Sequence, residues 1–178
     1  MTEVYQPRED TYLLLECMEE YAHDENVILE VGTGSGYVVS NLESELTNSK
    51  VIGSDISTQS AIEASKRTGC VVVSNLANCF RENSLDVIGF NLPYLSQRDT
   101  DDELDRRALS YNKGLLKDYV EEAERCLKNN GVCVFVVSNK TPENPSSIVE
   151  SSSFRRVEVR TKKSFFENIN AFVCRLNC

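Results

Sequence analysis

The feature that most constrains the fold is a short apolar segment that leads into closely spaced glycines and then into a helical pattern. Val27-Ile28-Leu29-Glu30-Val31 has the composition of a buried strand, and Gly32, Gly34 and Gly36 follow it. Glycines between a strand and a helix allow a tight turn and let a ligand approach the backbone closely. The spacing differs from the G-x-G-x-x-G of dinucleotide-binding turns, so alone it is weak support for any ligand. The apolar segment, the glycines and the helical pattern together still predict the strand-turn-helix start of an α/β sheet.

Strand and helix patterns alternate along the rest of the chain. Strands are expected at residues 27–31, 51–56, 70–74, 85–90, 132–137, 154–159 and 170–176, and helical spacing marks 4–20, 38–46, 57–67, 115–127 and 148–150. Such alternation is typical of a mainly parallel sheet, and the last two strands form an antiparallel hairpin. A length of 178 residues fits one domain. We predict a single α/β domain over 1–178, with a seven-stranded sheet and an N-terminal helical region over 1–24.

Two acidic residues stand at the ends of the first two strands. Glu30 ends a buried strand, where a carboxylate is costly without a partner, and a cationic amino group on a ligand would supply one. Asp55 follows the glycines by about twenty residues, the distance at which dinucleotide folds place an acid on ribose hydroxyls. The alternative role for Asp55 is to cap the helix expected at 57–67, although Ser57 or Thr58 is better placed for that.

The fourth strand leads into Asn91-Leu92-Pro93-Tyr94. The Asn91 side chain carries an acceptor oxygen, and Leu92 is biased toward extended geometry because it precedes a proline. The Asn91 oxygen and the Leu92 carbonyl can then hold both hydrogens of one NH2 group, with Tyr94 flat over the planar group that carries it. This arrangement suits chemistry on the nitrogen of an amide or an amino-base, and the alternative is a plain exit from a strand into a turn. Polar residues at four strand ends are predicted to line one crevice: Glu30, Asp55, Asn75 and Asn91.

The charge balance limits the classes of partner. The formal net charge is −9 and the isoelectric point is about 4.7. Enzymes that bind a duplex normally present a basic face, because neutralising phosphates supplies most of their non-specific affinity. The basic clusters here are Arg155-Arg156 and Arg160 with Lys162-Lys163, near the far end of the chain. The acidic balance argues against a direct nucleic-acid substrate and favours a basic protein partner or substrate.

The cysteines indicate a reducing compartment. There are seven, an odd number, with no C-x-x-C pair, and Cys70, Cys126 and Cys133 lie in or beside apolar runs. We expect reduced, mostly buried thiols in a cytosolic or nuclear protein. Cys174 and Cys178 could be half of a metal site, but a chain with one histidine makes this a poor interpretation, and no metal is expected. No run is apolar and long enough to span a membrane, and no secretory signal follows Met1.

Two motifs carry a family resemblance. Asn91-Leu92-Pro93-Tyr94 resembles the [Asn/Asp/Ser]-Pro-Pro-[Tyr/Phe] motif of S-adenosylmethionine-dependent methyltransferases that act on planar amino groups, and Leu92 replaces the usual first proline. Pro7-Arg8-Glu9-Asp10-Thr11 resembles the Pro-x-Glu-Asp-Thr opening that caps the cofactor in one subgroup. With the glycine turn and Asp55, these motifs make nearly the whole chain resemble the HemK-like protein-glutamine N5-methyltransferases, in their short eukaryotic and archaeal branch.

The resemblance implies a class I, Rossmann-like methyltransferase fold and S-adenosylmethionine as cofactor. Thr11 and Glu30 would then attend the methionine end of the cofactor, Asp55 the ribose, and Asn75 the adenine amino group, with Leu76 against the adenine face. The implied cofactor-binding residues are Thr11, Glu30, Gly32, Gly34, Gly36, Asp55, Ile56, Asn75, Leu76 and Asn91. The implied catalytic residues are Asn91, Leu92, Pro93 and Tyr94.

The resemblance also implies a substrate and a partner. The branch methylates the glutamine of the Gly-Gly-Gln motif in the class I translation termination factor, and in eukaryotes it works with a small zinc-binding activator protein. The apolar segment 71–73 is expected at a sheet edge, where the activator could add a strand. Residues 97–107 are dense in charge, as expected for a solvated loop or for a lid that faces the substrate. The alternatives are an N6-adenine methyltransferase on DNA or RNA, a protein-lysine methyltransferase, and a non-catalytic module that binds the cofactor.

Overall fold

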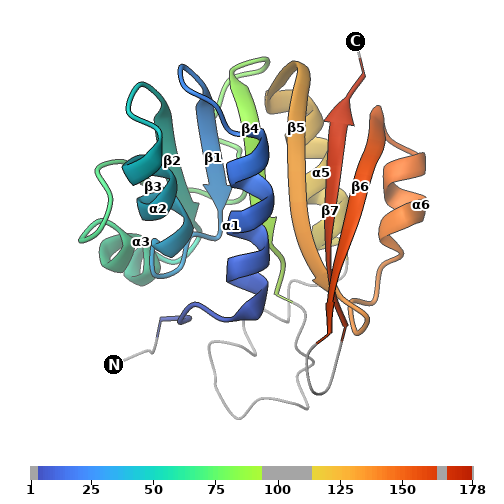
Figure 1. Cartoon of the computed structure of the whole chain (residues 1–178), viewed down its shortest axis with the longest axis horizontal. Helices are drawn as coiled ribbons and strands as arrows, with labels where there is room; N and C mark the ends of the chain where they lie inside the picture. The colour runs from blue at the N-terminus through green and yellow to red at the C-terminus, as the bar shows by residue number, and fades with distance from the viewer. Residues whose placement is uncertain (1–3, 94–113, 164–167, 178) are drawn as a thin grey trace.

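The computed structural model describes residues 4–93, 114–163 and 168–177 (Figure 1). The strands are β1 (Val27–Val31), β2 (Lys50–Asp55), β3 (Val71–Val73), β4 (Leu85–Asn91), β5 (Leu127–Ser138), β6 (Phe154–Lys163) and β7 (Asn168–Leu176). The helices of the described part are α1 (Glu9–Tyr21), α2 (Tyr37–Glu45), α3 (Thr58–Ala64), α5 (Leu115–Cys126) and α6 (Pro145–Glu150). None of the helices in these three ranges has the length and apolar character needed to cross a membrane.

The seven strands form one sheet in the order β3-β2-β1-β4-β5-β7-β6. β1 to β5 pair in parallel, whereas β7 lies antiparallel between β5 and β6. The predicted α/β class, the seven strands and the antiparallel C-terminal hairpin are confirmed. The chain builds outward from β1 through β2 to β3 and then returns to place β4 on the other side of β1. Ligands of doubly wound sheets bind at such a reversal of strand order, outside the carboxyl ends of the strands.

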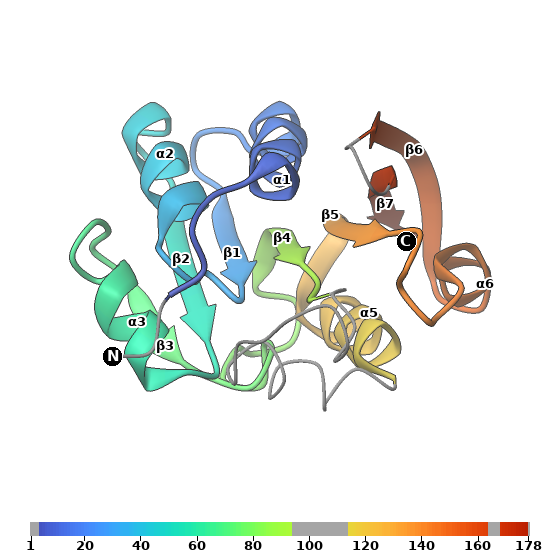
Figure 2. The same cartoon turned by 90° about the horizontal axis from the view of Figure 1, so that it is seen from below.

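Helices cover both faces of the sheet (Figure 2). α1 and α2 bury one set of apolar side chains against one face, and α5 and α6 bury a second set against the other. α1 lies directly on β4, because Gly89 leaves room there for Met18. A Cβ atom built at Gly89 would lie 2.2 Å from Met18 Sδ, so no other residue fits at position 89 without movement of the helix or its side chain. This contact fixes α1 over the strand that ends in Asn91.

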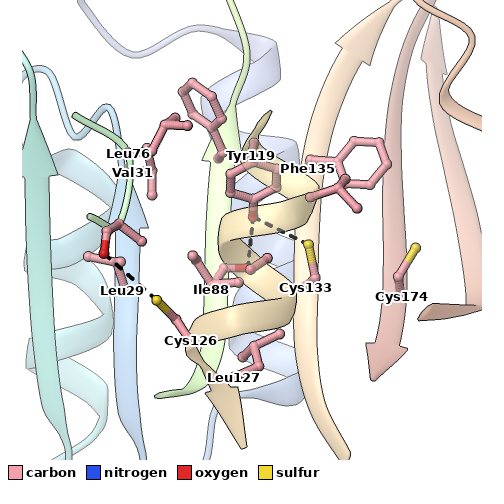
Figure 3. Close-up of a cluster of buried hydrophobic side chains, with 14 of the residues drawn as sticks. Leu29, Val31, Leu76, Ile88, Tyr119, Cys126, Leu127, Cys133, Phe135 and Cys174 are labelled. Carbon is pink, nitrogen blue, oxygen red and sulfur yellow. Dashed lines mark hydrogen bonds between the residues drawn. The ribbon is translucent and has the colours of Figure 1, made fainter. Parts of the chain in front are cut away.

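A buried tyrosine ties α5 to the opposite face of β4 and β5 (Figure 3). The Tyr119 hydroxyl lies 2.9 Å from the Val134 carbonyl oxygen and 3.2 Å from the Ile88 carbonyl oxygen, and Cys133 Sγ lies 3.5 Å from it. Because a buried hydroxyl needs a partner, these contacts fix the rotation of α5 about its axis. The middle of β4 is therefore held from both faces, by Met18 at Gly89 on one side and by Tyr119 at Ile88 on the other.

Several element boundaries differ from the sequence-based expectations. The N-terminal helix, expected over 4–20, begins only at Glu9, because Arg8 is an extended N-cap residue. α3 is shorter than 57–67 and ends at Ala64. α5 ends at Cys126, within one residue of the expected end, but β5 begins at once at Leu127 rather than at 132, with a shift in the β4–β5 register.

Candidate functional site

The polar residues predicted to share a crevice do lie at one end of the sheet. Glu30, Asp55 and Asn91 stand at or near the carboxyl ends of β1, β2 and β4, and Asn75 follows β3. These four strands are neighbours in the order β3-β2-β1-β4, and adjacent strands are about 4.8 Å apart. Figure 2 shows the molecule from this end, with the carboxyl ends of β1, β2 and β4 side by side. The structure thus brings the predicted residues together at the reversal of strand order.

The glycine turn after β1 has the conformation that its sequence predicts. Gly32, Gly34 and Gly36 have φ values of 67°, 52° and 77°, in the left-handed region that favours glycine. A Cβ at Gly36 would lie 2.9 Å from the Cα of Ala64, so this glycine lets α2 start close against α3. The backbone oxygen of Tyr5 lies 3.7 Å from the Cβ position of Gly34, so the segment before α1 passes over the turn.

Glu30 is a buried carboxylate beneath that turn. Its side chain is 4% exposed, and Thr33 Oγ1 donates a hydrogen bond of 2.7 Å to Oε2. Burial raises the pKa of Glu30 to about 8, while hydrogen bonds from Thr33 and the Val39 backbone lower it and the charge of Asp55 raises it. Within the described ranges no cationic side chain forms an ion pair with Glu30. A cationic group brought by a ligand would therefore stabilise the ionised form.

Asp55 organises the backbone on both sides of the crevice. Its Oδ2 accepts a hydrogen bond of 3.0 Å from Gly34 N, and its Oδ1 accepts one of 2.8 Å from Ser57 N. Burial raises the pKa of Asp55, and the two backbone hydrogen bonds lower it. The helix-capping role falls to Ser57, whose Oγ accepts from Ser60 N at 3.3 Å. A carboxylate has about four acceptor positions, so Asp55 keeps capacity for hydroxyl donors.

The predicted adenine-binding residues Asn75 and Leu76 follow β3, and the predicted cofactor-binding residue Ile56 follows Asp55 at the end of β2. The Ile56 side chain is 60% exposed, and Asn75 is also exposed. Leu76 is buried with φ of 49°, and its carbonyl oxygen accepts from Ser54 Oγ at 3.3 Å. Thr11 is buried in the first turn of α1, where its Oγ1 accepts from Arg8 N at 3.3 Å.

The end of β4 carries an acceptor without a donor. Asn91 Oδ1 is buried and makes no hydrogen bond to any described residue. The backbone beside it is fixed, since Asn91 pairs with Val136 and Leu92 N donates to Val136 O at 3.1 Å. Leu92 is buried and Pro93 is half-buried, whereas Tyr94 and the charged segment 97–107 lie outside the described residues. A buried acceptor left unpaired costs about 1–3 kcal/mol, so this atom is suited to receive a donor from a ligand.

Sequence reasoning missed three residues that support the site. Thr33 bonds Glu30 from within the glycine turn, and its position three residues after the acid was a usable signal. Ser54 holds the Leu76 carbonyl, and Arg125 holds the turn that follows it. No local pattern reveals the role of Arg125, because its partners lie more than 40 residues earlier in the chain.

Comparisons with known proteins agree with this geometry. The family model of the methyltransferase small domain matches residues 8–169. A bifunctional methyltransferase of Rickettsia felis is 30% identical over 147 residues, which is 71% of this chain and 28% of that protein. The chain spans only about a quarter of the length of the bifunctional methyltransferases it matches. A Methanocaldococcus jannaschii protein, provisionally named a protein N5-glutamine methyltransferase, is 29% identical over 155 residues, covering 79% of this chain and 75% of that one.

Solved structures show the same fold. The E. cuniculi Mtq2–Trm112 complex, responsible for the methylation of the eRF1 translation termination factor, matches with a TM-score of 0.73 at 21% identity, covering 98% of this chain and 99% of that chain. The expected class I methyltransferase fold and the resemblance to HemK-like protein-glutamine methyltransferases are confirmed. The chain belongs to the methyltransferase small-domain family.

Proposed function

We propose that this chain transfers a methyl group to the side-chain amide nitrogen of a glutamine, in the Gly-Gly-Gln motif of the class I translation termination factor. The observation that carries the proposal is the buried Asn91 Oδ1, which has no partner in the described part of the chain. A glutamine amide offers two N–H donors on a planar group. One of them would satisfy this oxygen, and the other the neighbouring Leu92 carbonyl.

The carboxyl ends of β1 and β2 fit the methyl donor. S-adenosylmethionine supplies a methyl group on a positively charged sulfur, already activated for transfer. Glu30 would hold the cationic amino group at the methionine end, together with Thr11 and the turn of Gly32, Gly34 and Gly36. Asp55 would accept from the ribose hydroxyls, Asn75 from the adenine amino group, and Ile56 and Leu76 would pack against the purine. The uncompensated Glu30 carboxylate is the feature that most favours a cationic ligand.

On the acceptor side the chain acts by orientation. An amide nitrogen is a poor nucleophile, and Asn91 Oδ1 with the Leu92 carbonyl would fix the direction in which it faces. We assign Tyr94 to stack on the amide plane and Pro93 to keep Leu92 extended. No strong base is assigned, because alignment and fixed dipoles can supply much of the rate enhancement. Leucine in place of a first proline keeps the carbonyl, and its backbone is instead anchored by the hydrogen bond to Val136.

Two relatives support the choice of a glutamine substrate. The M. jannaschii relative is named for N5-glutamine methylation, and it matches over most of both chains. The E. cuniculi complex acts on a translation termination factor, and its fold covers nearly all of this chain. The six cysteines of the described part are free, which fits the proposed place of action in the cytosol or the nucleus.

The two edges of the sheet differ in a way that suggests where the activator binds. Native edge strands are usually protected by charged side chains and bulges. β6 has both, with exposed Arg155, Arg156 and Lys163 and a register shift around Val157. β3 has neither: it is a run of three valines, and Val73 is 55% exposed beside α3. We propose that the zinc-binding activator adds a strand to β3. The E. cuniculi relative was solved in complex with Trm112, which supports a partner but does not locate it.

The substrate proposal is tested with the chain co-expressed with the activator. Methyl transfer is measured on the intact termination factor, on its Gly-Gly-Gln glutamine→alanine version, on duplex DNA and on a lysine-rich histone. We expect transfer to the intact factor alone. Equal transfer to the glutamine→alanine factor would exclude the glutamine, and transfer to DNA or histone would establish the adenine or lysine alternative instead.

The partner proposal is tested by a matched pair of edge substitutions. Val73→Glu places a charge on the β3 edge, and Val159→Glu does the same on the β6 edge, where Val159 is 40% exposed. We expect Val73→Glu to abolish co-purification with the activator and Val159→Glu to leave it intact. If both variants bind the activator as well as the wild type, the partner does not use β3.

A further inference from the structure

The turn after β3 holds an unusual backbone conformation. Leu76 has φ of 49° and is buried. A bulky residue in the left-handed region is strained and persists only when its surroundings hold it. Ser54 Oγ holds the Leu76 carbonyl at 3.3 Å from the sheet side. The other side of the turn is held by side chains of α5.

Arg125 lies in the C-terminal turn of α5 and binds the segment that follows β3. Its Nη1 donates to the Phe80 carbonyl at 2.7 Å, and its Nη2 donates to the Ala77 carbonyl at 3.0 Å. Glu122 orients the guanidinium, accepting from Nη2 at 2.7 Å and from Nε at 3.3 Å. The planar fork of arginine can serve two carbonyls and a carboxylate at once, which the single ammonium of lysine cannot do with the same geometry.

The neighbouring residue and the backbone add to this grip. Cys126 Sγ lies 3.7 Å from the Ala77 carbonyl oxygen. Asn83 N and Ser84 N donate to the carbonyls of Arg125 and Cys126, at 3.1 and 2.8 Å. The segment that begins with Asn75 and Leu76 is thus held against the end of α5.

We propose that Arg125, oriented by Glu122, is a positioning residue that sets how the chain recognises the purine of its methyl donor. The proposal rests on the role assigned above to Asn75 and Leu76. Arg125 does not touch the ligand; it holds the turn at Ala77 and Phe80 so that Leu76 keeps its strained conformation and Asn75 faces the purine amino group. When the Arg125 guanidinium is lost, the turn relaxes. The main result is that the chain no longer prefers a purine that carries the amino group over one that lacks it.

The test compares the product of methyl transfer with its deaminated analogue. S-adenosylhomocysteine carries the amino group, and S-inosylhomocysteine carries a carbonyl in its place. Affinities for both are measured by calorimetry on the full chain purified with its activator. The variants are Arg125→Lys and Glu122→Gln, and the control is Lys117→Met. Lys117 lies on the same helix with its side chain 66% exposed and pairs only with Glu121 among the ion pairs of the described residues.

We expect the wild type and Lys117→Met to prefer the adenine compound by roughly tenfold or more, because a site built to pair a polar group rejects its replacement. In Arg125→Lys the affinity for the adenine compound falls roughly tenfold and the preference largely disappears, while turnover at saturating donor stays within about threefold. Glu122→Gln shows the same pattern more weakly, and it provides the answer if Arg125→Lys does not fold.

Three results overturn the proposal. One is a wild type that binds both compounds equally. Another is an Arg125→Lys variant that has a lower melting temperature but keeps the full preference, because this would show a structural role alone. The third is a Lys117→Met variant that loses the preference as well. Failure of methyl transfer to glutamine would refute the proposed substrate but would leave these binding measurements intact, so the two failures are distinguishable.

Discussion

The two halves of the crevice differ in how completely their polar groups are paired. At the ends of β1 and β2, Glu30 accepts from Thr33, and Asp55 accepts from Gly34 and Ser57. At the end of β4, Asn91 Oδ1 has no donor among the described residues. The first half is a preorganised scaffold whose hydrogen bonds exist before any ligand arrives. The second half has a polar atom that no described residue pairs, and a ligand could pair it.

This difference suits the two roles proposed for the halves. The methyl donor must bind again at every turnover. A fixed backbone at its site favours binding, because few protein groups must then become ordered. An acceptor site that must hold one amide in one direction benefits from an acceptor that nothing else occupies. The unpaired Asn91 oxygen is also a local loss of stability, of the kind that functional sites commonly carry. The predictions below test the contrast, in order of decreasing effect.

Asn91→Ala should give the largest effect. Removing the open acceptor should lower turnover on the glutamine substrate by roughly 10²–10³-fold, by analogy with loss of one preorganised hydrogen-bonding group. The hydrogen bonds of Glu30 and Asp55 are untouched, so affinity for S-adenosylhomocysteine should stay within about twofold. Steady-state kinetics and calorimetry on the same preparation measure both quantities.

Asn91→Asp is the matched control for that variant. Aspartate places an acceptor oxygen at the same distance from the backbone, so Asn91→Asp should retain more activity than Asn91→Ala. Turnover near that of the wild type in Asn91→Ala would mean that the unpaired oxygen has no part in the reaction, and the contrast between the halves would then describe folding alone.

The pH dependence of donor binding should give the next effect. Burial raises the pKa of Glu30 to about 8, and a cationic amino group favours the ionised carboxylate. Donor binding should therefore release a proton, and affinity should rise on the order of 50-fold between pH 6 and pH 8. Glu30→Gln should bind more weakly and with a nearly flat profile over this range. An equally steep profile in the glutamine variant would assign the titration to another group.

The same pKa shift sets the sign of a stability effect. The Glu30 pKa is raised from 4.5 in the unfolded reference to about 8 in the folded chain. Below pH 4.5 Glu30 is protonated in both the folded and the unfolded state, and the contribution of this pKa shift to the free energy of unfolding is present in full. As pH rises toward 8 the unfolded state releases its proton first, so stability is lost. Urea unfolding of the wild type between pH 5 and pH 8 should show this decline, and Glu30→Gln should show less of it.

Much of the fold could be predicted from the sequence because its signals are local. The apolar runs and the glycine turn identify β1, and the valine run and its neighbours place β3 at an edge. The early start of β5 was missed because residue 127 joins the strand by pairing with β4, which no local pattern shows. The start of α1 was missed because the extended backbone of Arg8 delays the helix to Glu9.

The positions of the candidate site residues could be predicted from the sequence, but their contacts could not. Glu30, Asp55 and Asn91 follow apolar runs, so their position at strand ends could be inferred from alternation alone. That Asp55 bonds Gly34, or that Arg125 grips the turn after β3, depends on chain segments brought together by the sheet. No pattern along the sequence contains that information, because the partners are separated by 21 and 45 residues.

Asp55→Asn should have a moderate effect confined to the donor half. An asparagine oxygen can keep one of the two backbone hydrogen bonds, but its NH2 group cannot accept the other. The loss of one bond to a charged group should weaken S-adenosylhomocysteine binding roughly tenfold and leave turnover at saturating donor within about threefold. A fall in turnover with unchanged affinity would place Asp55 in the acceptor half and would break the contrast.

Gly89→Ala should have the smallest effect on turnover. It tests whether the donor half and the acceptor half of the site are structurally coupled through β4. Gly89 pairs with Glu30 in the sheet and precedes Asn91 by two residues, so it belongs to both. A Cβ there would meet Met18 Sδ at 2.2 Å, and the repacking should lower stability by about 1–3 kcal/mol. For a chain of this size that is on the order of 2–4 °C in melting temperature for each kcal/mol.

Because Met18 packs on the middle of β4, this strain should move α1 as a body. Donor affinity and turnover should therefore each change by only about twofold and in the same direction. The double variant Gly89→Ala with Met18→Ala removes the clash, so it should be more stable than the sum of the two single losses predicts. A selective loss of turnover in Gly89→Ala, with donor affinity intact, would show instead that β4 transmits strain to Asn91 alone and that the two halves are mechanically separate.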